Sequence, residues 1–186
     1  MTFFAILYAT ERASYPVTDI ILSNIPVFDV DGIFLYGPLL FWIFIGVYLI
    51  FFEPKKLPFS LKSISLFLVI RSFFISLTHI GPFPSHAQID PTGIIGAFNS
   101  GSDLFFSSHT GLPFLMALIF WDNKFRRLFC LFASFLFGAV VLMAHLHYTI
   151  DVFSAFFITY AIFKISEKLF KNDRNFCING IESGNA

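Results

Sequence analysis

The stretch LFCLFASFLFGAVVLMA, which covers residues 128–144, contains no charged side chain. Basic residues come just before it, at Lys124, Arg126 and Arg127, and the segment His-Leu-His at 145–147 follows it. A helix needs about 20 apolar residues to cross the hydrocarbon core of a bilayer. The stretch therefore predicts a transmembrane helix with a basic start and an end beside two histidines.

Four further stretches have the same character. The five predicted spans are Ile33 to Phe52, Ile64 to Ile80, Leu104 to Trp121, Leu128 to Ala144 and Tyr148 to Phe170. A sixth apolar segment, Phe3 to Ala9, is too short to span and is stopped by Glu11 and Arg12. It is either the end of a truncated span or a helix that lies on the membrane surface. We predict an all-α polytopic transmembrane helix bundle with five full spans plus a short or truncated N-terminal helix.

The composition supports this class. Of 186 residues, 56% are hydrophobic and 13% are charged, and the mean hydropathy is +0.77. A soluble domain of this size could not bury so much apolar surface, which excludes a soluble or disordered chain. Equal numbers of basic and acidic residues give no reason to expect a nucleic-acid partner. We expect one membrane-embedded catalytic domain over residues 1–172 and a short cytoplasmic tail over residues 173–186.

The basic residues predict the orientation of the bundle. Ten of the twelve fall in alternate segments between the spans or at and after the end of the last one, namely Lys55, Lys56, Lys62, Lys124, Arg126, Arg127, Lys164, Lys168, Lys171 and Arg174. Basic loops remain on the cytoplasmic side of a membrane. All five histidines fall at the opposite ends of the spans or in the outer loop, namely His79, His86, His109, His145 and His147. The histidines are either simple interfacial residues or parts of a site on the non-cytoplasmic face.

The last predicted span opens with His147-Tyr148-Thr149-Ile150-Asp151. His147 and Asp151 are four residues apart and share one face of a helix. At that spacing the carboxylate can accept the proton of one ring nitrogen and leave the other nitrogen ready to attack or to accept a proton. The alternative is a pair that only stabilises the helix.

A second element, Ser107-Ser108-His109-Thr110, stands at the outer start of the third predicted span. A serine can cap this helix, whose free backbone N–H groups then form a site for phosphate. His109 is the candidate proton donor beside it. The alternative is an ordinary capping serine next to an interfacial histidine. Together the two elements fit phosphoryl transfer through a phosphohistidine, which needs no metal or other cofactor.

Several motifs resemble the sphingomyelin synthase-like family of the type 2 phosphatidic acid phosphatase superfamily. They are SSHT at 107–110, AHLHYTIDVFSAFFITY at 144–160, RSFFISLTHIGPFP at 71–84 and TERASYPVTDIIL at 10–22. The resemblance implies a six-helix core, with His147 as nucleophile, Asp151 as its partner and His109 as general acid and base. It implies transfer of a phosphorylated head group from a phospholipid to a lipid alcohol such as ceramide or diacylglycerol, within the bilayer.

The sequence departs from the family's pattern at two positions. Ser108 stands where the family has glycine, which lets the backbone approach phosphate closely. Val141 stands where the phosphatase branch has arginine, which favours the synthase branch. Ser107, Ser108 and Thr110 are the predicted phosphate-binding residues.

Arg71, His145 and Asp19 are possible supporting residues. Arg71 falls near the middle of a predicted span, where an isolated charge is costly. It either forms an ion pair with Asp19 or Asp103 or reaches a head-group phosphate.

Three other functions stay open from the sequence alone. A lipid phosphate phosphatase or phospholipase C-like hydrolase would use the same residues with water as acceptor. A metal enzyme or transporter would use His79, His109, His145 and His147 as ligands. A non-catalytic lipid-binding protein would use none of them.

Overall fold

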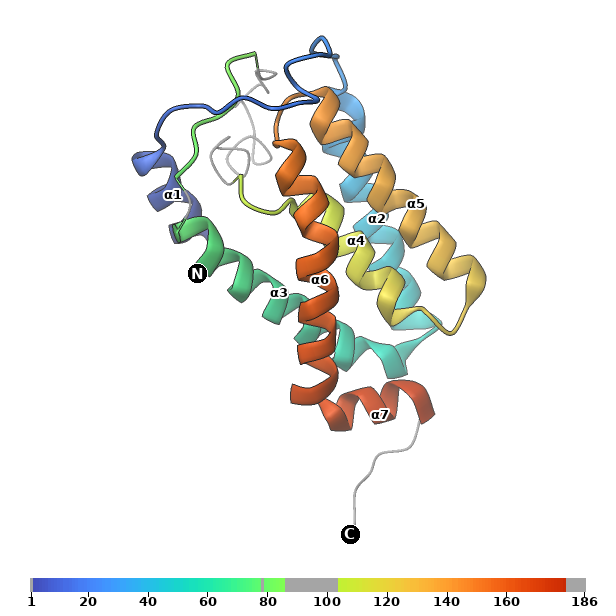
Figure 1. Ribbon diagram of the computed structural model, residues 1–186. Helices are drawn as coiled ribbons and strands as arrows, with labels where there is room; N and C mark the ends of the chain where they lie inside the picture. Colours follow the sequence, from blue (N-terminus) through green and yellow to red (C-terminus); the bar gives the residue numbers. More distant parts are fainter. Residues whose placement is uncertain (1, 78, 86–103, 180–186) are drawn as a thin grey trace.

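The computed structural model describes residues 2–77, 79–85 and 104–179. Within these ranges every regular element is a helix (Figure 1). The elements are α1 (Thr2–Arg12), α2 (Asp31–Phe51), the 3-10 turn η1 (Pro54–Lys56), α3 (Leu57–Leu77), α4 (Ser108–Ile119), α5 (Lys124–Met143), α6 (Thr149–Leu169) and α7 (Lys171–Asn179).

Four of these segments are long and apolar enough to cross a membrane: α2, η1 with α3, α5 and α6. Many of their large apolar side chains face outward, including Phe44, Phe132 and Phe157. Surfaces of this kind are suited to contact with lipid rather than with water. The predicted all-α transmembrane bundle is therefore confirmed, and the chain is an integral membrane protein.

The third predicted span is shorter than expected. Residues 104–121 lie wholly within the described part of the chain, but only Ser108–Ile119 form a helix. Before it the backbone bends at residues 105 and 106, where Phe106 has a positive φ of 30°, and only Ser107 is extended. Twelve residues rise only about 18 Å, which is less than the hydrocarbon thickness of about 30 Å.

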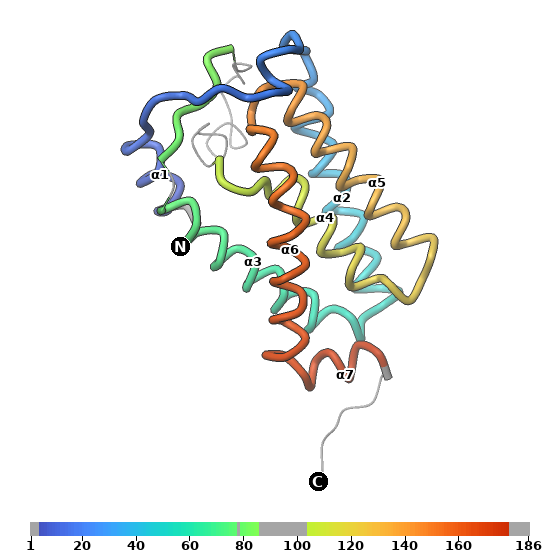
Figure 2. The backbone as a smooth tube through the Cα atoms, viewed as in Figure 1, coloured from blue at the N-terminus to red at the C-terminus, as the bar shows by residue number. Residues whose placement is uncertain are grey.

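α4 lies inside the bundle and packs mainly against α5 and α6 (Figure 2). Glycine permits this close packing. A Cβ on Gly111 would lie 2.7 Å from Thr159 Oγ1 and 2.8 Å from the Phe67 ring, and one on Gly138 would lie 3.1 Å from Thr110 Oγ1. Because neighbouring helices cover α4, it has little contact with lipid and does not need the length of a full span.

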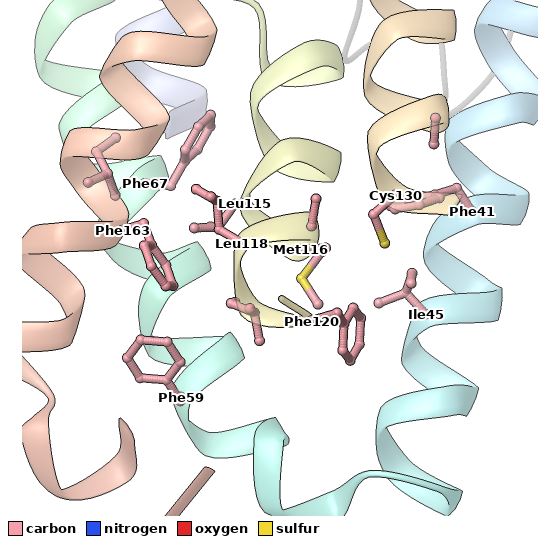
Figure 3. Packing of buried hydrophobic residues seen from close by; sticks show 14 of the residues in the cluster. Phe41, Ile45, Phe59, Phe67, Leu115, Met116, Leu118, Phe120, Cys130 and Phe163 are labelled. Atoms are coloured by element: carbon pink, nitrogen blue, oxygen red, sulfur yellow. The ribbon is translucent and has the colours of Figure 1, made fainter. Parts of the chain in front are cut away.

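The apolar core surrounds the C-terminal half of α4. Leu115, Met116 and Phe120 are fully buried between Phe67 of α3 and Cys130 of α5 (Figure 3). This packing fixes α4 against both neighbours and so determines where its N-terminal end lies.

The two ends of the bundle differ in charge. At one end, ion pairs join segments far apart in the chain: Lys56 to Asp122 at 2.8 Å, Lys62 to Asp173 at 2.7 Å, and Arg126 to Glu53. The pair with Asp173 holds α7, which covers part of the predicted tail. At the other end lie His109, His145 and His147, at the start of α4 and between α5 and α6. His86 lies outside the described residues.

The short N-terminal segment forms α1, an 11-residue helix that packs against α3. The predicted apolar segment Phe3 to Ala9 falls inside it. At this length α1 is too short to cross the bilayer. After α1 the chain runs back over the histidine end of the bundle, where Ser14 donates its backbone N–H to the His79 carbonyl at 2.8 Å.

Candidate active site

The starts of α4 and α6 lie side by side. The Ser107 backbone N–H donates to the Asp151 carbonyl at 3.0 Å. The His109 and His147 rings lie 6.4 Å apart between centroids, and the Phe34 ring lies 4.8 Å from that of His109. The structure thus brings together the three residues for which the sequence predicts catalytic roles, although they come from separate helix starts.

A backbone carbonyl orients the His147 ring. His147 Nδ1 lies 3.1 Å from the Leu104 carbonyl oxygen. Because a carbonyl can only accept, this contact requires the proton on Nδ1 and leaves the lone pair on Nε2. No sequence pattern pointed to Leu104, since every residue type has a backbone carbonyl that could orient a ring.

Asp151 has two roles at the start of α6. Its Oδ2 accepts the backbone N–H of Tyr148 at 2.9 Å, a capping contact that stabilises the helix without involving the His147 ring. The same oxygen lies 3.6 Å from His147 Nδ1, beyond a normal hydrogen bond but within strong electrostatic reach. Asp151 is fully buried, and its Oδ1 has no hydrogen-bond partner within the described ranges. The carboxylate is therefore placed to stabilise a positive charge on His147.

The predicted phosphate-binding residues differ in their placement. Ser107 is the N-cap residue of α4, but its side chain is buried and makes no capping hydrogen bond. The first N–H groups of a helix have no partner within the helix, so the start of α4 retains donors for an anion. Ser108 is half-buried at that start. Thr110 instead is buried against Gly138 of α5.

Arg71 supports the segment that leads into α4. Its guanidinium Nε donates to the Phe106 carbonyl at 3.2 Å, at the residue with positive φ. In α3, which runs from Leu57 to Leu77, Arg71 lies a little past the middle of the helix, in the half toward the histidine end. Asp19, one predicted ion-pair partner, is engaged elsewhere, and Asp103 lies outside the described residues.

Asp19 fixes the start of α6 from a distant part of the chain. Its carboxylate accepts the backbone N–H of Thr149 at 2.7 Å and the Thr149 hydroxyl at 2.6 Å. Burial acts to raise the pKa of Asp19, but hydrogen bonds from Thr149, Leu22 and Ile21 outweigh it and hold the pKa below its ordinary value. Asp19 is therefore a structural support of the helix that begins beside His147.

His145 ends α5 in a left-handed turn with φ of 55°. The Leu146 N–H bonds to the Val141 carbonyl and the His145 N–H to the Leu142 carbonyl, which together form a Schellman motif. The His145 Nδ1 lies 3.0 Å from the Ser85 hydroxyl, and burial lowers the pKa of the ring. The structure gives His145 a role in the turn that leads to His147.

Metal-ligating side chains do not gather in this region. Across residues 2–77, 79–85 and 104–179, no group of three or more His, Cys, Asp or Glu side chains is placed to hold a metal ion. His79, one of the proposed ligands, packs instead on the ring of Tyr8 at 5.4 Å.

The comparisons with known proteins give one match. No curated protein and no solved structure matches the chain. Residues 101–168, which include both histidine-containing helix starts, match the family model described as PAP2 superfamily C-terminal. This match supports the PAP2 superfamily, and with it an enzyme that acts on phosphate esters.

Proposed function

We propose that this chain is a sphingomyelin synthase-like lipid phosphotransferase. It would move a head group of the phosphocholine or phosphoethanolamine type from a glycerophospholipid to a lipid hydroxyl such as that of ceramide. The observation that carries the proposal is the 6.4 Å separation of the His109 and His147 rings at two adjacent helix starts. Val141, where the phosphatase branch has arginine, favours transfer over hydrolysis.

In the first step, His147 Nε2 attacks the phosphorus atom. The hydrogen bond from Nδ1 to the Leu104 carbonyl leaves the Nε2 lone pair available for this attack. The bond from phosphorus to the diacylglycerol oxygen breaks, and protonated His109 gives its proton to that oxygen. Diacylglycerol leaves, and the phosphorylated head group remains on His147. Asp151 stabilises the positive charge that the ring then carries, and the N–H groups at the start of α4 bind the phosphate oxygens.

In the second step, neutral His109 accepts the proton of the acceptor hydroxyl. The acceptor oxygen attacks phosphorus, the bond to His147 breaks, and both histidines return to their starting protonation states. If water replaces the lipid alcohol as acceptor, the same steps hydrolyse the phospholipid. A hydrolase is therefore the alternative function for this site.

The deciding experiment uses purified protein in vesicles with head-group-labelled phosphatidylcholine or phosphatidylethanolamine, with and without ceramide. We expect a new labelled sphingolipid and labelled, acid-labile protein. His147→Asn should abolish both. His79→Asn is the matched control, because His79 lies at the same end but outside the site.

Release of free phosphocholine or phosphate without a new lipid would establish the hydrolase instead. Unchanged turnover in His147→Asn would show that His147 is not the nucleophile and that the active site lies elsewhere. Turnover without any labelled protein would mean that the head group passes directly from donor to acceptor, with no phosphohistidine intermediate.

A further inference from the structure

A second feature lies at the basic end of the bundle, away from the histidines. A cavity of about 390 Å³ opens between α2, the α4–α5 turn and the start of α5. This size is typical of cavities that bind part of a small molecule. None of the residues discussed for the active site lines it, so it has no part in the proposed reaction.

The walls of the cavity are apolar and largely aromatic. Its inner end is formed by Ile45, Phe120 and Cys130, which Figure 3 shows facing one another. Its outer walls include Phe44 and Phe125, which are 52% and 82% exposed on helices long enough to span a membrane. A groove with such walls in a spanning helix pair is open to lipid and fits a hydrocarbon chain.

One charged residue, Arg126, lines the cavity. Its guanidinium lies over the rings of Phe120 and Tyr48, at 5.5 Å and 5.7 Å, and its Nη1 donates to Tyr48 and to Glu53. Its Nε is buried and has no hydrogen-bond partner in the described part of the chain. This N–H therefore remains available to an acceptor that enters the cavity.

The charges around the opening favour an anionic acceptor. The ion pairs of Arg126 with Glu53 and of Lys56 with Asp122 account for both carboxylates nearby. Lys124 and Arg127 lie in the first turn of α5 together with Arg126, and the described residues contain no ion pair with either of them. This helix start thus adds two positive charges that no carboxylate balances to the same end of the bundle, which attracts a phosphate-bearing lipid of net negative charge.

We infer that this cavity is a second lipid-binding site, in which an anionic phospholipid places its phosphate at Arg126 and part of one acyl chain between α2 and α5. The site would bind without turnover, at the end of the bundle opposite to the proposed chemistry. It goes beyond the proposed function and does not depend on it.

Native mass spectrometry of the full chain in detergent tests this inference, with phosphatidylglycerol and phosphatidylcholine of identical acyl chains as probes. We expect one phosphatidylglycerol to bind about tenfold more tightly than phosphatidylcholine, because both lipids offer the same phosphate but the choline cation of phosphatidylcholine is repelled by the Arg126 guanidinium. Arg126→Gln should remove this preference. Arg127→Gln is the matched control, because it removes the same charge from a side chain that lies over Trp121 and lines no part of the cavity.

A second pair of variants tests the acyl groove without touching an ion pair. Phe125→Ala should weaken binding of both lipids, whereas Phe132→Ala, also exposed on α5 but outside the cavity, should not. If Arg126→Gln and Arg127→Gln lowered the affinity for phosphatidylglycerol equally, the lipid would be held only by general attraction to the basic surface, and the inference would be wrong. Equal binding of the two lipids, or binding unchanged in both Arg126→Gln and Phe125→Ala, would overturn the inference.

Discussion

The Asp19 carboxylate accepts two hydrogen bonds from Thr149, a residue 130 positions later in the chain. One bond comes from a backbone N–H in the first turn of α6 and the other from the Thr149 hydroxyl. Asp19 thereby serves as a cap that another segment supplies to this helix. Because α6 begins two residues after His147, the contact also fixes the chain that carries the proposed nucleophile.

Loss of this cap should lower stability. We expect Asp19→Ala to reduce the free energy of unfolding by about 1–3 kcal/mol, since buried N–H and hydroxyl groups lose their acceptor. Thermal unfolding in detergent measures the change. Asp29→Ala, an exposed carboxylate in the same connecting segment, is the control and should unfold like the wild type. Equal melting temperatures for both variants would contradict the role given to Asp19.

The lowered pKa of Asp19 predicts a dependence of stability on pH. A carboxyl whose folded-state pKa is depressed stabilises the fold above its unfolded pKa, which is about 3.9 for aspartate. That stabilisation is lost as the pH falls from about 4 through the folded-state value. The difference in melting temperature between wild type and Asp19→Asn should therefore shrink on acidification below about pH 4. A difference that stays constant over that range would show that ionised Asp19 is not the stabilising form.

Substitution of His109 and substitution of His147 should have different effects when the donor's leaving group is changed. With a natural phospholipid, His109→Asn should lower turnover by about 10²–10⁴-fold, the usual contribution of general acid–base catalysis. With p-nitrophenylphosphocholine, whose leaving group needs no proton, this variant should still form labelled protein but release it slowly. His147→Asn should form none with either donor. Rapid-quench labelling measures the amounts, and equal labelling of the two variants would contradict the assigned roles.

Arg71 should act through the backbone of Phe106. We expect Arg71→Met to lower kcat by about tenfold or more, because the segment that leads to His109 loses its support and small misplacements of catalytic groups are costly. Lys62→Met, on the same helix at the basic end, should leave kcat unchanged. Turnover in the vesicle assay and thermal unfolding measure the two effects separately. A normal kcat in Arg71→Met would leave Arg71 with a packing role alone.

The positive φ of His145 predicts an unusual order of stabilities. Both the glycine and the alanine variant lose the contact with Ser85, but glycine adopts this conformation without strain, whereas alanine retains the strain. We expect His145→Gly to be about 1 kcal/mol more stable than His145→Ala. Thermal unfolding of the two variants measures the difference, and the reverse order would contradict a left-handed turn at this position.

The sequence predicted most bounds of the long spans well because their signal is local. The predicted span Ile64 to Ile80 was wrong at its start, because α3 begins at Leu57 and the polar residues Ser60, Lys62 and Ser63 interrupt its apolar pattern. The predicted span Leu128 to Ala144 differs from α5 mainly by its first turn, which contains the charged residues Lys124 and Arg126. The length of α4 was not predictable in this way. Residues Leu104 to Ser107 are apolar or small, but hydrogen bonds to distant parts of the chain hold them in a non-helical conformation.

The candidate site could be predicted only in part. The residue types at His109, His147 and Asp151 and the alternation of spans placed these side chains at one end of the bundle. The partners that orient them depend on tertiary packing, and no local pattern encodes such pairs: the Leu104 carbonyl for His147, the Phe106 carbonyl for Arg71, and Thr149 for Asp19.

α4 and α6 both begin at the histidine end and therefore run in the same direction (Figure 1). Each helix start carries about half an elementary positive charge from its aligned peptide dipoles. At the start of α6 the Asp19 and Asp151 carboxylates offset this charge, whereas the N-cap side chain of α4 makes no hydrogen bond. The uncompensated positive helix start is therefore that of α4, so an anion that enters this end of the bundle is drawn to α4 and repelled from the start of α6.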